Sequence, residues 1–100
     1  MGTKESAKER TRIKIEEPKK YRVIMHNDDF TTMDFVVEVL TEIFRKSPQE
    51  AERIMLFVHQ KGKAVVGTYP YDMAVTRAEK AMARARAEGF PFLVTVEDAG

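Results

Sequence analysis

The sequence contains no cysteine. Disulfide bonds and thiolate metal sites are therefore excluded, and nothing in the composition requires an oxidising compartment. Long apolar runs are also missing, because the longest fall far short of the roughly 18 to 20 residues that span a bilayer. The amino terminus lacks the apolar segment of a signal peptide. We therefore expect a soluble protein that acts in a reducing cytoplasm.

A strong excess of charge of either sign is absent as well. Seventeen Lys or Arg and sixteen Asp or Glu leave a net charge of +1. This balance does not indicate nucleic acid or an anionic membrane as the main partner. The charge is uneven along the chain, because residues 1–20 carry seven basic and four acidic side chains. That segment has only Ile13 and Ile15 as large apolar residues after Met1, so we expect a flexible tail over 1–20.

The remaining residues predict one small α+β domain over 21–97. Strands are expected at residues 21–26, 63–69 and 92–96, where β-branched and aromatic residues are frequent. Helical patterns separate them, so the predicted order is β-α-α-β-α-β. This order allows a three-stranded sheet with helices over one face. A chain of this length can bury enough surface to fold without covalent cross-links.

Helix boundaries are marked by capping residues. Thr31 and Asp34 have capping-box spacing and predict the start of a first helix. Ser47 and Pro48 predict the start of a second helix, which Gly62 ends. A third helix is expected between Pro70 and Gly89. The apolar residues expected to pack are Met33, Val36, Val37, Leu40, Ile43 and Phe44, then Ala51, Ile54, Met55 and Val58, then Tyr71, Ala74, Val75, Ala78, Met82 and Ala85.

Polar side chains concentrate at the first strand-to-helix turn. His26 is followed by Asn27, Asp28 and Asp29, and we expect His59 of the second helix to lie nearby. Asn and Asp often serve only to satisfy the backbone of a turn. The cluster, however, offers hydrogen-bond acceptors and no neighbouring cation, which suits a protonated amine. A free α-amino group has three donors, so oxygens of Asn27 and Asp28 and a neutral His59 nitrogen could each accept one.

Two stretches carry a resemblance to a known family. Residues 27–36 read NDDFTTMDFV, which is similar to the ClpS stretch N-D-D-aromatic-T-P-M-E-F-V. Residues 55–62 read MLFVHQKG, which resembles the ClpS pattern M-L-x-V-H-x-x-G. The match extends from about Tyr21 to Val96. It implies a non-enzymatic adaptor that binds N-degron proteins and delivers them to a Clp AAA+ unfoldase and protease.

The resemblance also implies roles for individual residues. Asn27, Asp28 and His59 would hold the α-amino group of the substrate, and Asp29 and Thr31 would shape its first peptide unit. The pocket for a large first side chain (Leu, Phe, Tyr or Trp) would be lined by Met33, Val36, Met55, Val58 and Phe92. Met33 and Met55 also have a plainer interpretation, because Met at helical spacing is usually core filler. Met33 is similar to a gatekeeper that crowds β-branched Ile and Val.

Two positions depart from the family pattern. Thr32 stands where the family often has Pro in the first helical turn, which should reduce rigidity more than function. Phe92 stands where many members have Leu, and the larger ring could narrow the pocket. The sequence therefore does not predict which amino-terminal residue of a substrate binds best.

The resemblance further implies partners. Asp72 and Arg77 would contribute to docking on the amino-terminal domain of a ClpA-like or ClpC-like unfoldase, although a solvated charged face is an equal alternative. The tail over 1–20 would enter the unfoldase during delivery. No metal or cofactor is implied, nucleic acid and membrane are not expected as partners, and a bacterial cytoplasm is the expected location.

Two other functions are compatible with parts of the sequence. A hydrolase or metal enzyme could use His26, Asp28, Asp29 and His59 as proton-transfer groups or ligands. The sequence, however, contains no HExxH motif, no nucleophile elbow and no phosphate-binding glycine loop, which are typical of such enzymes. A nucleic-acid binder could use Arg77, Lys80 and Arg84, which recur at helical spacing. The acidic turn would oppose phosphate binding.

Overall fold

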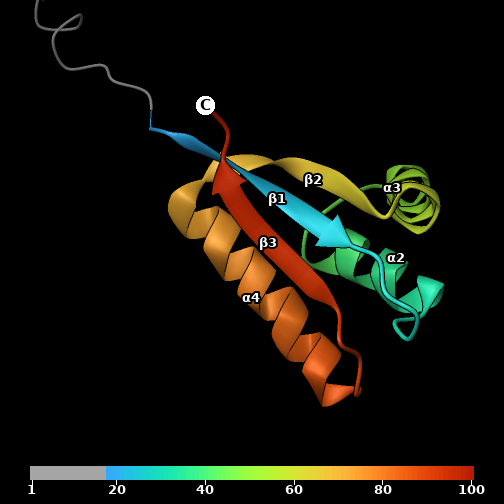
Figure 1. Cartoon of the computed structure of the whole chain (residues 1–100). Coiled ribbons are helices and arrows are strands. Elements are labelled where there is room, and N and C mark those ends of the chain that lie inside the picture. Colours follow the sequence, from blue (N-terminus) through green and yellow to red (C-terminus); the bar gives the residue numbers. More distant parts are fainter. Residues whose placement is uncertain (1–17) are drawn as a thin grey trace, which may run out of the picture.

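Six elements follow one another in the predicted order (Figure 1). The figure shows a computed structural model of the whole chain, and the structure describes residues 18–100. The elements are β1 (Lys20–His26), α2 (Met33–Glu42), α3 (Pro48–Lys61), β2 (Lys63–Pro70), α4 (Tyr71–Ala87) and β3 (Leu93–Asp98). The predicted α+β order is confirmed. The tail predicted over 1–20 lies outside the described residues except for its last three, and Lys20 already belongs to β1.

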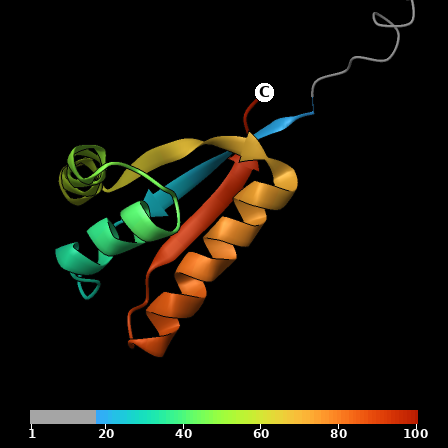
Figure 2. The same ribbon diagram turned by 180° about the vertical axis from the view of Figure 1, so that it is seen from behind.

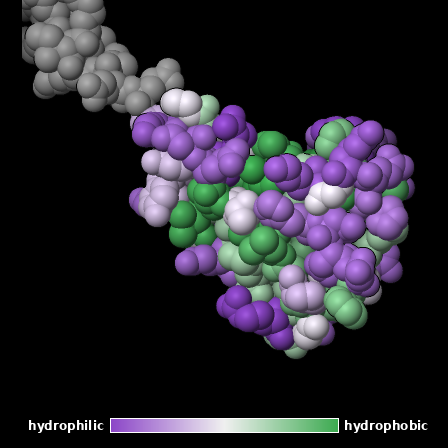
Figure 3. All heavy atoms as spheres, viewed as in Figure 1, coloured by the Kyte–Doolittle hydropathy of each residue, from purple (hydrophilic) through white to green (hydrophobic). Residues whose placement is uncertain are grey.

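The three strands form one antiparallel sheet in the order β2-β1-β3. β1 is central because it pairs with both other strands, and its last residue, His26, lies opposite Lys63 on one side and Leu93 on the other. Helices α2 and α4 lie on the same face of the sheet, and α3 lies beside the beginning of β2 (Figures 1 and 2). In the described part of the chain, no helix covers the opposite face. On that face, apolar side chains gather between hydrophilic ones over the sheet (Figure 3).

The start of α2 differs from the prediction by one residue. Thr32, not Thr31, caps the helix, because its extended backbone lets its hydroxyl oxygen accept a hydrogen bond from the Phe35 N–H at 3.2 Å. Thr31 is engaged elsewhere, with the carboxylate of Asp28. The helix buries Phe35, Val36, Val39 and Leu40. Met33, predicted to pack, is instead 43% exposed, because the helix turns its Phe35 and Val39 side toward the sheet.

The second helix, α3, follows the prediction closely. The Ser47 hydroxyl oxygen accepts a hydrogen bond from the Glu50 N–H at 3.2 Å, and Pro48 is the first helical residue. The four residues expected to face the core, Ala51, Ile54, Met55 and Val58, are all buried. Gly62 ends the helix with φ of +93°, a left-handed conformation in which glycine carries no Cβ penalty.

The last helix, α4, packs on the sheet through small side chains. Its buried residues are Ala74, Ala78, Ala81 and Ala85, which lets the helix approach the strands closely. Tyr71, predicted to be buried, is 56% exposed and packs edge-on against Tyr21 with ring centroids 5.0 Å apart. None of the helices within residues 18–100 is both long and apolar enough to cross a membrane.

Candidate functional site

The sheet register brings three separate stretches of chain to one end of the sheet. Because His26 pairs with both Lys63 and Leu93, the residues just beyond these pairs also gather there. They are Asn27 after β1, Gly62 before β2 and Phe92 before β3. The polar turn, the end of α3 and the start of β3 therefore meet at this end.

A direct hydrogen bond fixes two of these stretches to each other. The Asn27 N–H donates to the Gly62 carbonyl oxygen at 2.8 Å, and the Gly62 N–H donates to the Val58 carbonyl oxygen at 2.8 Å. The polar turn, residues 27–29, is thus hydrogen-bonded to Gly62, the C-cap of α3. His59, in the last turn of that helix, is held beside the turn by the same arrangement.

An open hollow of about 390 Å³ lies at this junction. It is bordered by the polar turn, the first turns of α2 and His59. Seven residues that the sequence singles out as binding residues line it together. The lining residues are Asn27, Asp28, Asp29, Phe30, Thr31, Thr32, Met33, Val36 and His59.

Two of the lining residues were not predicted to be at the site. Phe30 is 73% exposed at the edge of the hollow, and Thr32 reaches it while capping α2. An aromatic residue directly after an Asn-Asp-Asp turn and before the first helix begins is the signal that could have identified Phe30.

Asp28 organises the turn through three hydrogen bonds. Its Oδ1 accepts from the Phe30 N–H at 2.8 Å and from the Thr31 N–H at 2.7 Å. Its Oδ2 accepts from the Thr31 hydroxyl at 2.7 Å. A carboxylate oxygen has about two lone-pair positions. Oδ1 is therefore fully used within the turn, and Oδ2 has one position left for a ligand.

The same hydrogen bonds keep Asp28 ionised. Partial burial by itself would raise the pKa of Asp28, but the bonds from Thr31 and Phe30 outweigh it and lower the pKa below its ordinary value of 3.8. Asp28 therefore carries a full negative charge at neutral pH. A charged acceptor is the group that a protonated amine binds most strongly.

The electrostatic character of the hollow is one-sided. Asp28 and Asp29 both line it, and none of its nine lining residues is Lys or Arg. Asn27, Asp29 and His59 are exposed to solvent and so are accessible to a ligand. The hollow consequently suits a small cation with several hydrogen-bond donors.

The apolar residues predicted for the pocket lie at two depths. Met33 and Val36 line the hollow, with Met33 half-exposed at its edge. Met55, Val58 and Phe92 are buried and belong to the same core cluster as Val36. Phe92 packs edge-on against Phe35, with ring centroids 6.0 Å apart. The hollow therefore has an apolar side that continues into the core.

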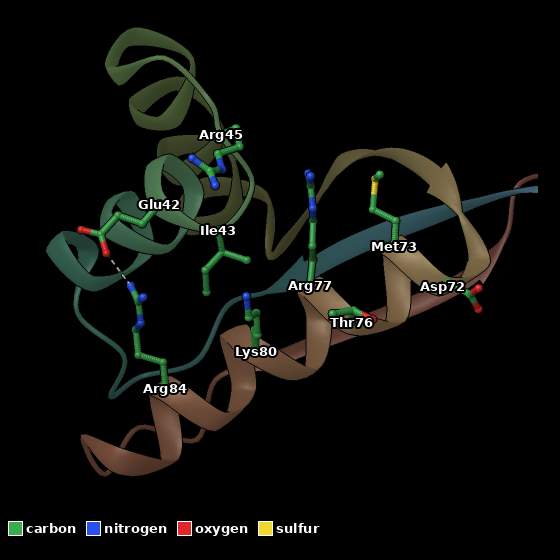
Figure 4. Close-up of a pocket in the computed structure, with 9 residues that line it drawn as sticks. All are labelled: Glu42, Ile43, Arg45, Asp72, Met73, Thr76, Arg77, Lys80 and Arg84. Carbon is green, nitrogen blue, oxygen red and sulfur yellow. Dashed lines mark hydrogen bonds and ion pairs between the residues drawn. The ribbon is translucent and has the colours of Figure 1, made fainter.

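A larger groove of about 610 Å³ lies between the end of α2 and α4. Both residues predicted for unfoldase docking, Asp72 and Arg77, line it (Figure 4). The guanidinium of Arg77 lies over the Tyr69 ring, 5.2 Å from the ring centroid, which limits its motion. Lys80 and Arg84, the other two residues of the basic helical pattern, line the same groove.

The four residues considered for a metal enzyme do not form one cluster, because Asp28, Asp29 and His59 line the hollow and His26 does not. His26 is directed to β3, where its Nε2 lies 2.8 Å from the Thr95 hydroxyl oxygen, and it does not line the hollow. Within residues 18–100, no three His, Asp or Glu side chains are placed to hold a metal ion.

Comparison with known proteins gives one consistent family. A protein-family model described as "ATP-dependent Clp protease adaptor protein ClpS" matches residues 16–95. The ClpS adapter protein of Oleidesulfovibrio alaskensis is 48% identical over 98 residues, which are 98% of this chain and 94% of that protein. The ClpS adapter protein of Neisseria meningitidis serogroup B is 51% identical over 81 residues, 81% of each chain.

A solved structure has the same fold. The structure of Agrobacterium tumefaciens ClpS2 bound to L-phenylalaninamide superposes with a TM-score of 0.79 at 39% sequence identity. The similarity covers 82% of this chain and 99% of that one. The ligand of that protein combines a free α-amino group with a large apolar side chain.

Proposed function

Because the chain belongs to the ClpS family of Clp protease adaptors, we propose that it binds the free α-amino group and large first side chain of N-degron proteins. It then delivers these proteins to a Clp AAA+ unfoldase without catalysing a reaction itself. The observation that carries the proposal is the cation-free hollow in which Asp28 and His59 from two different elements face the same space.

The α-amino group is held by three acceptors. The free position on Asp28 Oδ2, the Asn27 side-chain oxygen and a neutral His59 nitrogen each accept one of its three N–H donors. Asp29 and Thr31 border the first peptide unit. An acetylated amino terminus has lost two of these donors and its charge, so it binds poorly. Protonation of His59 weakens binding as well, because an imidazolium has no acceptor.

The first side chain enters on the apolar side of the hollow. Met33 and Val36 form the entrance, and Met55, Val58 and Phe92 form the buried end of the pocket. Leu, Phe, Tyr and Trp fill such a pocket, whereas the second Cβ substituent of Ile or Val collides with Met33. The Agrobacterium ClpS2 ligand, L-phenylalaninamide, has the two groups that this arrangement requires.

The expected affinity suits an adaptor. Burial of a Leu or Phe side chain contributes roughly 1.5 to 3 kcal/mol, and each hydrogen bond to a charged amine contributes about 1.5 to 3 kcal/mol. After the cost of association, a dissociation constant in the micromolar range follows. Such a complex forms readily and releases its cargo when an unfoldase pulls on it.

Delivery requires a second surface. Asp72 and Arg77 contact the amino-terminal domain of the unfoldase, and they lie in the groove between α2 and α4, away from the degron hollow. The two partners can therefore bind at the same time. The relatives are bacterial, and we place the activity in the bacterial cytoplasm.

A titration with peptides that differ only at their first residue tests the proposal. Fluorescence anisotropy is measured with labelled peptides beginning with Leu, Phe, Ile or Glu. Leu and Phe peptides should bind in the micromolar range, and Ile and Glu peptides should bind at least tenfold more weakly. Equal affinity for all four, or no binding to any, would contradict degron recognition.

A further inference from the structure

The groove between the end of α2 and α4 has an excess of positive charge. Four basic residues line it and only two acidic ones, Glu42 and Asp72. The basic residues come from both walls: Arg45 follows α2, and Arg77, Lys80 and Arg84 belong to α4.

The two acidic residues do little to neutralise the centre of the groove. The Arg84 guanidinium pairs with the Glu42 carboxylate at 2.8 Å, so these two charges cancel across the walls. Asp72 lines the groove only at its far end, with its carboxylate directed away from Arg77 and Lys80 (Figure 4). Lys80 and Arg77 rise from α4 toward the end of α2, where Arg45 lies. Within residues 18–100, Arg45, Arg77 and Lys80 therefore form no ion pair.

Arg45 is placed at the groove by an unusual backbone conformation. It has φ of +58°, and among residues 18–100 it is the one non-glycine residue with positive φ. The chain leaves α2 at Glu42 and turns at Arg45 before α3 begins. A left-handed conformation costs an ordinary residue about 1 kcal/mol or more, and this turn places Arg45 at the end of α2 beside the groove.

The groove also presents apolar surface. Ile43 projects into it from the end of α2, and Met73, which is 41% exposed, lines it from α4 (Figure 4). A ligand that matches both features carries acidic groups and an apolar side chain. A nucleic-acid backbone offers the charge alone, whereas an acidic protein segment offers both.

We infer that this groove docks an acidic protein segment that carries an apolar side chain, with Arg45 and Lys80 contacting its carboxylates alongside Arg77. The inference rests on the proposed function, since the docked segment belongs to the unfoldase amino-terminal domain. It names the chemistry of that partner's surface and adds the end of α2 to the docking surface.

Charge-reversal variants test the inference. Arg45→Glu and Lys80→Glu are compared with Arg86→Glu, a matched control on the exposed side of the same α4 helix that does not line the groove. The binding partner is the purified amino-terminal domain of a Clp unfoldase. The affinity of each variant for a Leu-peptide is measured in parallel, because retained peptide binding shows that the variant is folded.

We expect Arg45→Glu and Lys80→Glu each to weaken unfoldase binding at least tenfold and Arg86→Glu to weaken it less than twofold. Wild-type affinity should also fall steeply as salt rises from about 50 to 300 mM, because exposed charge pairs are screened. Peptide affinity should be unchanged in all three variants.

Two results would overturn the inference. If wild type binds the unfoldase domain and the groove variants behave like Arg86→Glu, docking occurs elsewhere, and degron recognition stands. If wild type binds the Leu-peptide but not the unfoldase domain, the delivery part of the proposed function fails together with the inference. Tight binding of single-stranded DNA that is lost in Lys80→Glu would also overturn it, in favour of nucleic acid.

Discussion

At the scale of single residues, Asp28 has a structural role in its turn, and we propose that it also binds the substrate amine. Its carboxylate closes the turn by accepting three hydrogen bonds, and the same bonds hold its negative charge toward the hollow. Thr31 supplies two of the three, one from its backbone and one from its hydroxyl. Thr31 is thus a positioning residue for Asp28, besides bordering the hollow itself.

Replacing Thr31 by Val tests this coupling, because Val keeps the shape and removes the hydroxyl. We expect the pKa of Asp28, followed by NMR titration, to rise in Thr31→Val and to stay low in Thr31→Ser. Affinity for a Leu-peptide should fall several-fold in Thr31→Val alone. An unchanged Asp28 pKa in Thr31→Val would show that the hydroxyl does not matter.

Thr31→Val also tests how the stability contributed by the Asp28 hydrogen bonds depends on pH. The folded pKa of Asp28 lies below its ordinary value of 3.8, so its hydrogen bonds stabilise the fold above that pH and the effect is lost as pH falls through the folded pKa. Thr31→Val should therefore be less stable than wild type at pH 7, by roughly 0.5 to 1 kcal/mol, and the difference should shrink below about pH 3.8. A constant difference across this range would contradict the explanation.

At the scale of elements, the site depends on where α3 ends. Gly62 adopts a left-handed conformation and its carbonyl oxygen accepts the Asn27 N–H, so the helix cap and the polar turn are built on one residue. The cap residues of α3 were predictable because Ser, Pro and Gly act through local chemistry. The cap of α2 was not, because Thr31 and Thr32 are equally good capping residues, and the Asp28 carboxylate decides between them.

The two left-handed glycines outside the carboxyl terminus provide a controlled test. Gly62 has φ of +93° and Gly89 has φ of +80°, and at both a Cβ atom would meet open space. Gly62→Ala and Gly89→Ala should each destabilise the fold by about 1 to 2 kcal/mol through backbone strain alone. Only Gly62→Ala should also weaken Leu-peptide binding, because it disturbs the link between Asn27 and His59. Equal peptide affinity in both variants would mean that the link is not needed.

At the scale of the whole molecule, the sequence predicted the order of elements and most of the residues that line the hollow, but not how deeply each residue is buried. Asn27, Asp28 and His59 were recognisable because each stands in a local motif, and the register of β1 with β2 brings the motifs together. Helical spacing could not tell that Met33 is exposed while Phe35 and Val39 are buried, because α2 has apolar residues on more than one side. Likewise, no local pattern joins Arg45 to Lys80, since their proximity depends on how α2 and α4 pack.

The two surfaces of the molecule have opposite electrostatic character. The hollow beside the polar turn contains acidic residues and no Lys or Arg, whereas the groove between α2 and α4 is mainly basic. A chain with nearly balanced overall charge therefore has two surfaces of opposite character, which fits the proposal of an amine ligand at one and an acidic partner at the other. This separation is what an adaptor with two simultaneous partners requires.

The central claim is that the hollow binds a free α-amino group, and one comparison tests it most directly. The affinity of the wild-type protein is measured for two Leu-peptides that are identical except that one is acetylated at its amino terminus. We predict that acetylation weakens binding at least a hundredfold, because it removes the charge and two hydrogen bonds worth about 1.5 to 3 kcal/mol each. Equal affinity for the two peptides would contradict the claim.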